Sequence, residues 1–588
     1  MKRMRPIVAL LAALLFAIPA QAQVTDRARV ANPAATPTAD QAPDLVKQYQ
    51  ATITPEDLAS HLYLFASDFF EGRDTGQKGQ KLAAAYLASQ YRKMGVAPAG
   101  TANPMDPRSP SAYYQPVPLY SSRLVSANLT VQGKGAAPVS SSFSTTSADD
   151  HFYVAFGNAP RATGGVVFGG FGIADAEQGF DEMAALKATG IDIADKWLMI
   201  LGGEPTDSEG KARLSADGAP TRWSRGPNAK FGGIMTVGMP AGVLFVSDHG
   251  STRPFSEMAT AAKAQMARGS GLSLDDPSSG APTRGRRGFP PVLMISTEMA
   301  NALLSGSGRT VASLAASISA SKSPDVFLVD GATATSSMEM ETIEMPSENV
   351  LGYIEGSDPV LKDQLVVISS HYDHVGINPA LEGDQVFNGA DDDGSGTVAV
   401  LEIAEAFARA RDAGHGPRRS ILFLNVTGEE KGLLGSSYYT DRQPVFPLEK
   451  TVTNLNVDMI GRIDPTHPGE DSDYVYIIGS NLISQELHDI NLRMNSMLST
   501  DLDLNERFNS KDDPNRFYQR SDHWNFGKHN IPFIFFFTGT HDDYHGVDDE
   551  PEKIEYERMA RISQVIFATA WQVANQDTPP VVSGTGFN

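Results

Sequence analysis

The second half of this chain alternates continuous apolar runs with helical stretches, and this pattern constrains its fold more than any other feature. Apolar runs typical of strands occupy 349–354, 364–370, 420–426, 452–457, 474–479 and 531–537. The clearest helix between them is predicted from Thr397 to Arg411. Strands that are apolar on both faces and alternate with helices indicate a mostly parallel sheet with helices on both sides. We therefore expect an α/β fold, a three-layer α/β/α sandwich with a mostly parallel central sheet.

The first half of the chain has a different texture. Between about 113 and 325, short apolar runs such as Trp197 to Leu201 are separated by Gly, Pro, Asn and Asp. This pattern predicts a small β-rich module with an exposed, turn-dense loop at 269–290. Before it, we expect one helix that begins at Pro55 with Thr54 as its N-cap, and a second from Gln80 to Met94 that Gly95 ends.

The first residues have the composition of an export signal. A basic start, an apolar run from Ile7 to Pro19 and the small-residue site Ala20-Gln21-Ala22 predict a signal peptide over 1–22. The apolar run is too short to span a bilayer comfortably. No later stretch approaches a spanning length, so we expect no membrane span in the mature chain. Residues 23–45 and 576–588 lack apolar periodicity and are predicted to be a flexible leader and a flexible tail.

Charge and cysteine content exclude some partners and compartments. The net charge is −22 and there is no basic patch, so nucleic acid is not an expected partner. The chain contains no cysteine. An exported protein without disulfides fits a bacterial periplasm or the surrounding medium better than a small disulfide-rich scaffold does.

Acidic and histidine side chains follow the predicted strands where these end. They are His371 with Asp373, the triplet Asp391-Asp392-Asp393, the pair Glu429-Glu430, Asp458, and the pair Tyr544-His545. Ligands of parallel sheets bind at the carboxyl ends of the strands. Two imidazoles and three carboxylates at one such edge are the ligands of a pair of zinc ions, with one further carboxylate left to act as a base.

The types of residue suggest how such a site would be divided. Two metals close together need a shared ligand, and a carboxylate of the aspartate triplet has two oxygens to offer. Of Glu429 and Glu430, one can bind metal while the other faces the attacking water as general base. Asp373, two residues after His371, is placed to orient the imidazole of that histidine.

Calcium is the alternative for the aspartate triplet. Asp391, Asp393, Ser395, Gly396 and Glu402 have the spacing of a calcium-binding helix–loop–helix motif. The preceding residues contain two glycines and no helical period, so the entering helix is missing. Calcium would also leave both histidine motifs unexplained, and zinc is therefore the preferred metal.

These motifs resemble those of a known family. HYDHVG, NGADDDGSGTVAVLE, GEEKGLLGS, NVDMIGR, SDHWNF and TGTHDDYH occur in the order and with the spacing of the co-catalytic zinc peptidases of metallopeptidase family twenty-eight. That family includes secreted bacterial leucine-type aminopeptidases and glutamate carboxypeptidase. The resemblance implies a catalytic domain made of 46–125 and 331–575, with a protease-associated domain inserted over 126–330.

The resemblance also implies roles for individual residues. His371 and Asp458 would bind one zinc ion, Glu430 and His545 a second, and Asp392 both, through an Asp392–Asp393 peptide bond that is typically cis. Glu429 would be the base, and Tyr544 would stabilise the oxyanion. Asp522 would support the site from behind. The remaining histidines of these motifs would be structural or pocket-lining: His374, His523 and His541.

The expected activity is hydrolysis of peptides from one end. Aminopeptidase action is favoured, with carboxypeptidase action as the alternative if a basic cluster lies near the pocket. The candidates for that cluster are Arg462, Arg507, Lys511, Arg516 and Arg520. A single-zinc glutaminyl cyclase and an inactive binding scaffold on the same fold are further alternatives, and the complete ligand set argues against both.

Overall fold

The computed structural model of the chain describes residues 42–147, 151–157, 159–268, 271–277, 290–467, 473–500, 502–584 and 586. The predicted signal peptide lies outside these residues, as do most of the predicted leader and most of the loop predicted at 269–290. Within the described part of the chain, no helix has the length and apolarity needed to cross a membrane.

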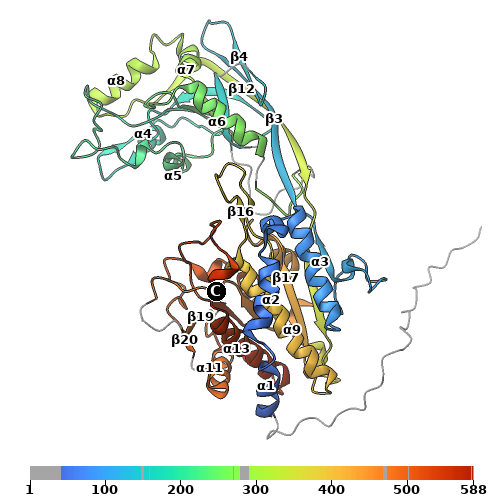
Figure 1. The fold of residues 1–588 in the computed structure, drawn as a ribbon. Coiled ribbons are helices and arrows are strands. Elements are labelled where there is room, and N and C mark those ends of the chain that lie inside the picture. Colours follow the sequence, from blue (N-terminus) through green and yellow to red (C-terminus); the bar gives the residue numbers. More distant parts are fainter. Residues whose placement is uncertain are drawn as a thin grey trace, which may run out of the picture.

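The chain forms two lobes, each built on its own sheet (Figure 1). The first sheet has nine strands in the order β1-β13-β17-β14-β18-β21-β19-β20, with β2 also paired to β13. Their bounds are β1 Ala97–Pro98, β2 Tyr114–Val117, β13 Ser347–Ile354, β14 Leu365–His371, β17 Ser420–Val426, β18 Thr451–Val457, β19 Tyr474–Ile478, β20 Asp503–Asn505 and β21 Phe533–Phe537. All six strands predicted from the apolar runs are present, and the three that the sequence did not predict are short.

Strand direction in this sheet is only partly as predicted. β17, β14, β18 and β21 are parallel to one another, but β13 is antiparallel to β17 and β19 is antiparallel to β21. The sheet is therefore mixed, with a parallel centre. For β13 the reason is that it follows β12 (Phe327–Glu344) of the other lobe through a short turn, with no crossover helix to bring it in parallel.

Helices cover the two faces of this sheet unequally. One face carries α9 (Gly396–Asp412), which packs on β14, β17 and β18, together with α1 (Ala42–Gln50), α2 (Pro55–Phe65), α3 (Lys78–Lys93), α11 (Gln485–Leu498) and α13 (Tyr556–Asn575). The other face carries the short helices α10 (Leu434–Ser437) and α12 (His523–Gly527), whose neighbourhood buries Tyr439 and Phe526 against Val367 and Leu422.

The predicted helices near the N-terminus are present, with one correction. Thr54 caps α2, because its side chain accepts a hydrogen bond from the Asp57 N–H. Gly95 follows α3 with a φ of 72°, as expected of a residue that ends a helix. The leader predicted as flexible to residue 45 is too long, because α1 begins at Ala42 and buries Val46 and Tyr49 in the core of the first lobe.

The second lobe contains an eight-stranded sheet in the order β4-β3-β12-β6-β9-β10-β11-β5. These strands span β3 Tyr120–Gln132, β4 Val139–Ser144, β5 Phe152–Phe156, β6 Arg161–Phe168, β9 Lys196–Leu201, β10 Gly242–Val246 and β11 Val292–Ile295, with β12 as given above. It also contains helices that the sequence prediction did not include: α4 Glu182–Ala188, α5 Asn228–Val237, α6 Phe255–Arg268, α7 Thr297–Leu304 and α8 Val311–Ser321.

The two lobes are joined through β3 and β12, which form one long antiparallel ladder from Tyr120 opposite Glu344 to Gln132 opposite Thr333 (Figure 1). The boundaries predicted at 126 and 330 fall inside these two strands. The second lobe has its own apolar cores, one of which contains Trp197 and Phe168. Its identity as a protease-associated domain stays a prediction.

Candidate metal centre

The structure brings the five side chains predicted as metal ligands together at the carboxyl ends of the parallel strands. His371 Nε2 lies 3.2 Å from Asp392 Oδ1 and 3.5 Å from Asp458 Oδ1. His545 Nε2 lies 3.0 Å from Asp392 Oδ2 and 3.1 Å from Glu430 Oε2. Asp392 therefore stands between two groups of donors and turns one carboxylate oxygen toward each.

The turn that carries Asp392 is held by close backbone contacts. The Asp392–Asp393 peptide bond is cis, as the family resemblance implies. Gly389 has a φ of 57°, and a Cβ there would lie 2.4 Å from the Asp392 carbonyl oxygen and 2.6 Å from the ring of His374. Both carboxylate oxygens of the buried Asp549 accept from the Asp391 N–H at 3.1 Å, and one also accepts from the Asp392 N–H at 3.1 Å. Glycine is needed where the chain turns back on itself this tightly.

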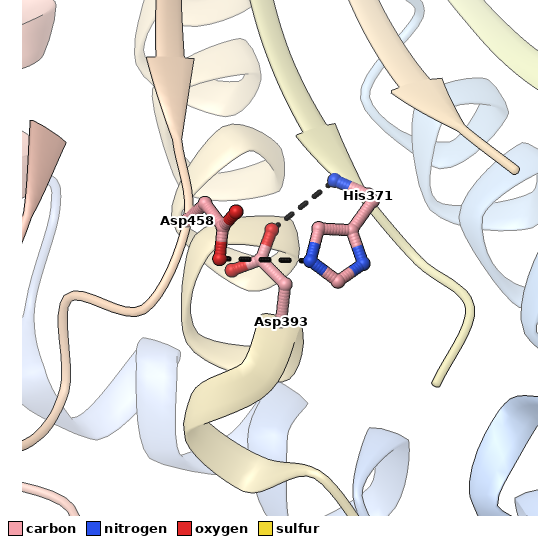
Figure 2. Close-up of side chains that lie close together, drawn as sticks. All are labelled: His371, Asp393 and Asp458. Atoms are coloured by element: carbon pink, nitrogen blue, oxygen red, sulfur yellow. Dashed lines mark hydrogen bonds and ion pairs between the residues drawn. The ribbon is translucent and has the colours of Figure 1, made fainter. Parts of the chain in front are cut away.

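Asp393 ties the strand ends together. Its carboxylate accepts from the main-chain N–H groups of His371 at 3.1 Å, Gly396 at 2.9 Å and Met459 at 3.1 Å. Figure 2 shows this carboxylate between His371 and Asp458, with the His371 imidazole turned toward Asp458. Because three N–H groups already use its oxygens, Asp393 positions the ends of β14 and β18 and is less suited to bind a metal than its neighbour Asp392.

Asp373 does not have the contact predicted for its side chain. The imidazole Nδ1 of His371 lies 3.1 Å from the main-chain oxygen of Asp373, so the backbone and not the carboxylate orients the ring. The carboxylate instead accepts from the Thr75 hydroxyl at 2.6 Å and from the Glu429 N–H at 3.2 Å. The side chain of Asp373 therefore positions Glu429.

Glu429 and Tyr544 line one small pocket with His371, Asp392 and Asp458. Glu429 Oε2 lies 3.9 Å from His371 Nε2. Burial raises the pKa of Glu429 well above its ordinary value, and the His371 imidazole opposes this shift while the Asp458 carboxylate adds to it. A carboxylate with a raised pKa suits proton transfer near neutral pH. Burial also raises the pKa of Tyr544, so its hydroxyl stays a hydrogen-bond donor.

His374 belongs to the site, although the sequence interpretation made it structural or pocket-lining. It is fully buried, and its Nδ1 lies 2.9 Å from Glu430 Oε1 and 3.8 Å from Asp392 Oδ2. His374, Asp392 and Glu430 form one of the two groups of side chains that are close enough to share a metal ion, among the residues described. Its position just after His371 and Asp373 at the end of β14 was a signal that could have indicated this.

The other predicted residues lie behind the site. His523 stacks on Phe535 with ring centroids 4.5 Å apart, and His541 Nε2 lies 3.3 Å from Asp391 Oδ2. Asp522 accepts from the Ser436 hydroxyl and does not hold a predicted ligand through any hydrogen bond described. The hydroxyl of the preceding residue, Ser521, donates to Asp458 Oδ2 at 2.6 Å. The support expected of Asp522 thus comes from Ser521, which sequence reasoning missed.

The donor set fits zinc. Burial lowers the pKa of His545, but hydrogen bonds to Asp392 and Glu430 outweigh it and raise this pKa to about 10. The five predicted ligands are three carboxylates and two imidazoles, and divalent cations would neutralise the negative charge of the carboxylates. Donors at about 2.1 Å from a tetrahedral zinc ion are about 3.4 Å from one another. The 3.0–3.5 Å separations around Asp392 match this spacing.

Part of the chain matches a known protein family. Residues 349–570 match the sequence profile of Peptidase family M28. Aminopeptidase YwaD of Bacillus subtilis is 33% identical over 115 residues, which are 20% of this chain and 22% of that protein. The probable glutamate carboxypeptidase LAMP1 of Arabidopsis thaliana is 33% identical over 118 residues, 20% of this chain and 15% of that protein. The chain thus matches less than a quarter of the length of either relative. The solved aminopeptidase from Aneurinibacillus sp. strain AM-1 superposes with a TM-score of 0.46 and 16% identity, over 92% of this chain and 98% of that one.

Proposed function

Residues 349–570 are a domain of peptidase family M28, and from this premise we propose that the chain is a zinc-dependent exopeptidase, most consistent with an aminopeptidase. The observation that carries the proposal is the arrangement around Asp392: His371 and His545 each approach one of its oxygens, Asp458 lies beside His371, and Glu430 lies beside His545. The predicted export signal lies outside the described residues, so a periplasmic or extracellular location stays a prediction.

We assign the donors to two zinc ions. His371 and Asp458 would hold one ion, Glu430 and His545 the other, and Asp392 both. Bound zinc would supply Lewis-acid chemistry, which polarises the scissile carbonyl and makes water a better nucleophile. His374 would hold Glu430 in place, since the His374 Nδ1 contacts Glu430 Oε1 while the His545 imidazole contacts Glu430 Oε2.

The chain's own groups carry the proton transfers. Glu429 accepts the proton of the attacking water and passes it to the leaving amine. Thr75 and Asp373 keep Glu429 in place, because the Asp373 carboxylate joins the Thr75 hydroxyl to the Glu429 N–H. Tyr544 donates its hydroxyl proton as a hydrogen bond to the oxyanion that develops on the carbonyl oxygen.

The rest of the pocket favours a free amino terminus with an apolar side chain. Met459, Phe517, Phe535 and Phe537 line it and offer an apolar surface. Acidic groups around the metals suit an α-ammonium group. Of the five basic residues predicted as candidates for reading a terminal carboxylate, Arg520 is the one that lines the pocket.

Arg520 is the observation that supports carboxypeptidase action as the second candidate. Its guanidinium lies 5.1 Å from the centre of the Phe517 ring and 3.4 Å from the Tyr544 hydroxyl. Arg462, in contrast, is paired with Asp543 at 2.9 Å. A single guanidinium is not a cluster, and aminopeptidase action remains the better fit.

Two variants and two kinds of substrate test the proposal. Glu429→Gln is expected to keep the zinc content of the wild type and to lose about 10²–10⁴-fold in kcat, whereas the exposed control Glu449→Gln should change neither. Asp392→Ala is expected to lose both zinc and activity. Aminoacyl anilides should be cleaved and N-acylated dipeptides with a free carboxylate should not. Full activity in Glu429→Gln would refute the assigned base, and the reverse substrate preference would make the chain a carboxypeptidase.

A further inference from the structure

A second pocket lies beside the metal centre and is strongly acidic. The end of α2, the 3₁₀ helix η1 (Asp68–Arg73), the segment that leads to Asp392 and the 3₁₀ helix η9 (Pro551–Lys553) surround a cavity of about 590 Å³. None of the described residues that line it is basic, and four carboxylates line it: those of Asp68, Asp384, Glu550 and Glu552. Nothing in the proposed peptidase chemistry uses these groups.

Asn388 lines this pocket and orients two of its carboxylates. Its side chain is 3% exposed, and its Nδ2 donates to Asp68 Oδ1 and to Glu550 Oε1, both at 2.9 Å. These two carboxylates fix the orientation of the amide, because only its NH₂ group can donate to them. The Oδ1 atom has no hydrogen-bond partner among the residues that the structure describes. This oxygen is itself closed off from solvent, so the polar groups that the pocket offers to a ligand are its carboxylates.

The carboxylates of this pocket also repel one another. Burial raises the pKa of Glu550; the Asn388 amide opposes that shift, while the charges of Asp384, Glu552 and Asp68 add to it. A positive charge at this place would relieve the repulsion, and so the pocket favours a cationic ligand.

The shape and lining of the pocket favour an organic cation over a metal ion. Among the described residues, the groups of side chains close enough to share a metal ion lie in the metal centre and include none of these four carboxylates. The cavity is also far larger than an ion. Two aromatic residues line the cavity and remain largely exposed to solvent: Phe69 is 80% exposed and Tyr63 is 48% exposed. Aromatic faces together with carboxylates recognise ammonium and guanidinium groups.

We propose that this pocket binds a basic side chain of a peptide, with the aliphatic part of a lysine or arginine on Phe69 and Tyr63 and its charged end among the four carboxylates. The pocket shares two short segments with the metal centre. Asn388 precedes Asp392 by four residues, and Glu550 follows Asp549, whose carboxylate accepts from the Asp392 N–H. For a peptidase, this would be a subsite for peptides with a basic residue, and in that respect the inference rests on the proposed function.

Binding of blocked peptides tests the pocket without depending on catalysis. The probes are a fluorescent pentapeptide of alanines with a central arginine, and the same peptide with citrulline, both acetylated and amidated so that an exopeptidase cannot cleave them. Citrulline keeps the shape and most of the N–H groups of arginine but has no charge. The full chain is expected to bind the arginine peptide about tenfold or more tightly than the citrulline peptide.

Substitutions in the pocket locate that preference. Asp384 and Glu552 are exposed, so the double variant Asp384→Asn/Glu552→Gln should fold, and it is expected to bring the two affinities within about twofold of each other. Phe69→Ala should weaken the binding of both peptides. Glu449→Gln, an exposed acid outside the pocket, is the matched control and should behave as the wild type does.

Three outcomes would overturn the proposal: equal affinity of the wild type for both peptides, an arginine preference that the double variant keeps, or calcium binding that the double variant abolishes and that displaces the arginine peptide. Because the probes are blocked and binding is the readout, each outcome is independent of whether the chain hydrolyses peptides. If the wild type does not hydrolyse aminoacyl anilides, that result would count against the proposed function and not against the proposed binding of a basic side chain.

Discussion

Arg73 is expected to be the side chain outside the ligand set on which the metal centre depends most. It is fully buried. Its guanidinium donates to five main-chain carbonyls: those of Tyr372 at 3.1 Å, Phe65 at 3.2 Å, Asn388 at 2.6 Å, Gly389 at 2.8 Å and, most distantly, Asp392 at 3.5 Å. Arg73 thus joins the end of α2 to the residue after His371 and to the turn that carries Asp392. The change that tests this is Arg73→Met, which keeps much of the volume and removes every donor.

The magnitude follows from two opposing terms. Each buried carbonyl left without a donor costs about 1–3 kcal/mol. The Gly389 carbonyl keeps the Gly394 N–H as a donor at 3.2 Å. About 1.5–2 kcal/mol for each of the carbonyls of Tyr372, Phe65 and Asn388 gives about 4.5–6 kcal/mol. Burial lowers the pKa of Arg73 to about 10 from 12.5, although nearby carboxylates, Asp392 first, oppose the shift. Keeping the charge buried therefore costs about 3 kcal/mol, which the substitution relieves. We therefore expect Arg73→Met to destabilise the first lobe by about 1.5–3 kcal/mol.

Urea unfolding measures the change in the free energy of unfolding, and hydrogen–deuterium exchange measures how often the 388–393 segment opens locally. The amide exchange rate of this segment should rise in the Arg73→Met variant, and the affinity of the variant for zinc should fall. Lys93→Met, an exposed substitution near the end of α3, is the matched control and should change the unfolding free energy by less than about 0.5 kcal/mol. A variant within about 1 kcal/mol of the wild type, with unchanged exchange over 388–393, would refute this reasoning.

Three further substitutions probe other parts of the molecule. His374→Asn removes the imidazole from Glu430 and should weaken zinc binding about 10–100-fold in a chelator competition, and an unchanged affinity would show that His374 does not support the ligand. Burial lowers the pKa of His523 to about 3. Since the unfolded chain then binds the extra proton below pH 6.5, stability should fall by about 2 kcal/mol from pH 7 to pH 5, and His523→Gln should remove this part of the pH dependence in urea titrations. In the second lobe, Lys230 Nζ donates to the Leu201 carbonyl at 3.0 Å and to the Gly203 carbonyl at 2.6 Å. Lys230→Met leaves these two carbonyls without that donor and should destabilise the second lobe by about 2–4 kcal/mol. Calorimetry would show a lower transition temperature for that lobe, and an unchanged transition would contradict the prediction.

Much of the first lobe could be predicted because its strands are apolar on both faces. β14, β17, β19 and β21 are buried along their whole length, so most of each sequence is a continuous apolar run. The ends of these runs then indicate where polar side chains meet, which is how the ligand candidates were found. The direction of β13 could not be predicted in this way, because it depends on how the chain returns from the second lobe.

The supporting residues could not be predicted because their contacts are formed only in the folded chain. Arg73 donates to the Tyr372 carbonyl, 299 positions away in the sequence, and nothing in its local pattern distinguishes it from a surface arginine. The same holds for Thr75, whose hydroxyl reaches Asp373. His374 differs: it lies in the same motif as His371, so its position near the site could be predicted, but its contact with Glu430 could not.

The insertion of the second lobe explains how residues so far apart in sequence can share one site. Tyr120 lies opposite Glu344 in the β3–β12 ladder, so the chain leaves the first lobe and returns to it at neighbouring points. The residues between them have their own apolar cores and need no support from the first sheet. Because the entropy of closing a loop grows only slowly with its length, such an insertion adds little cost to bringing η1 against the end of β14. The N-terminal segment therefore supports the loop that carries Asp392 as closely as an adjacent element of sequence would, and the candidate metal centre involves both parts of the first lobe.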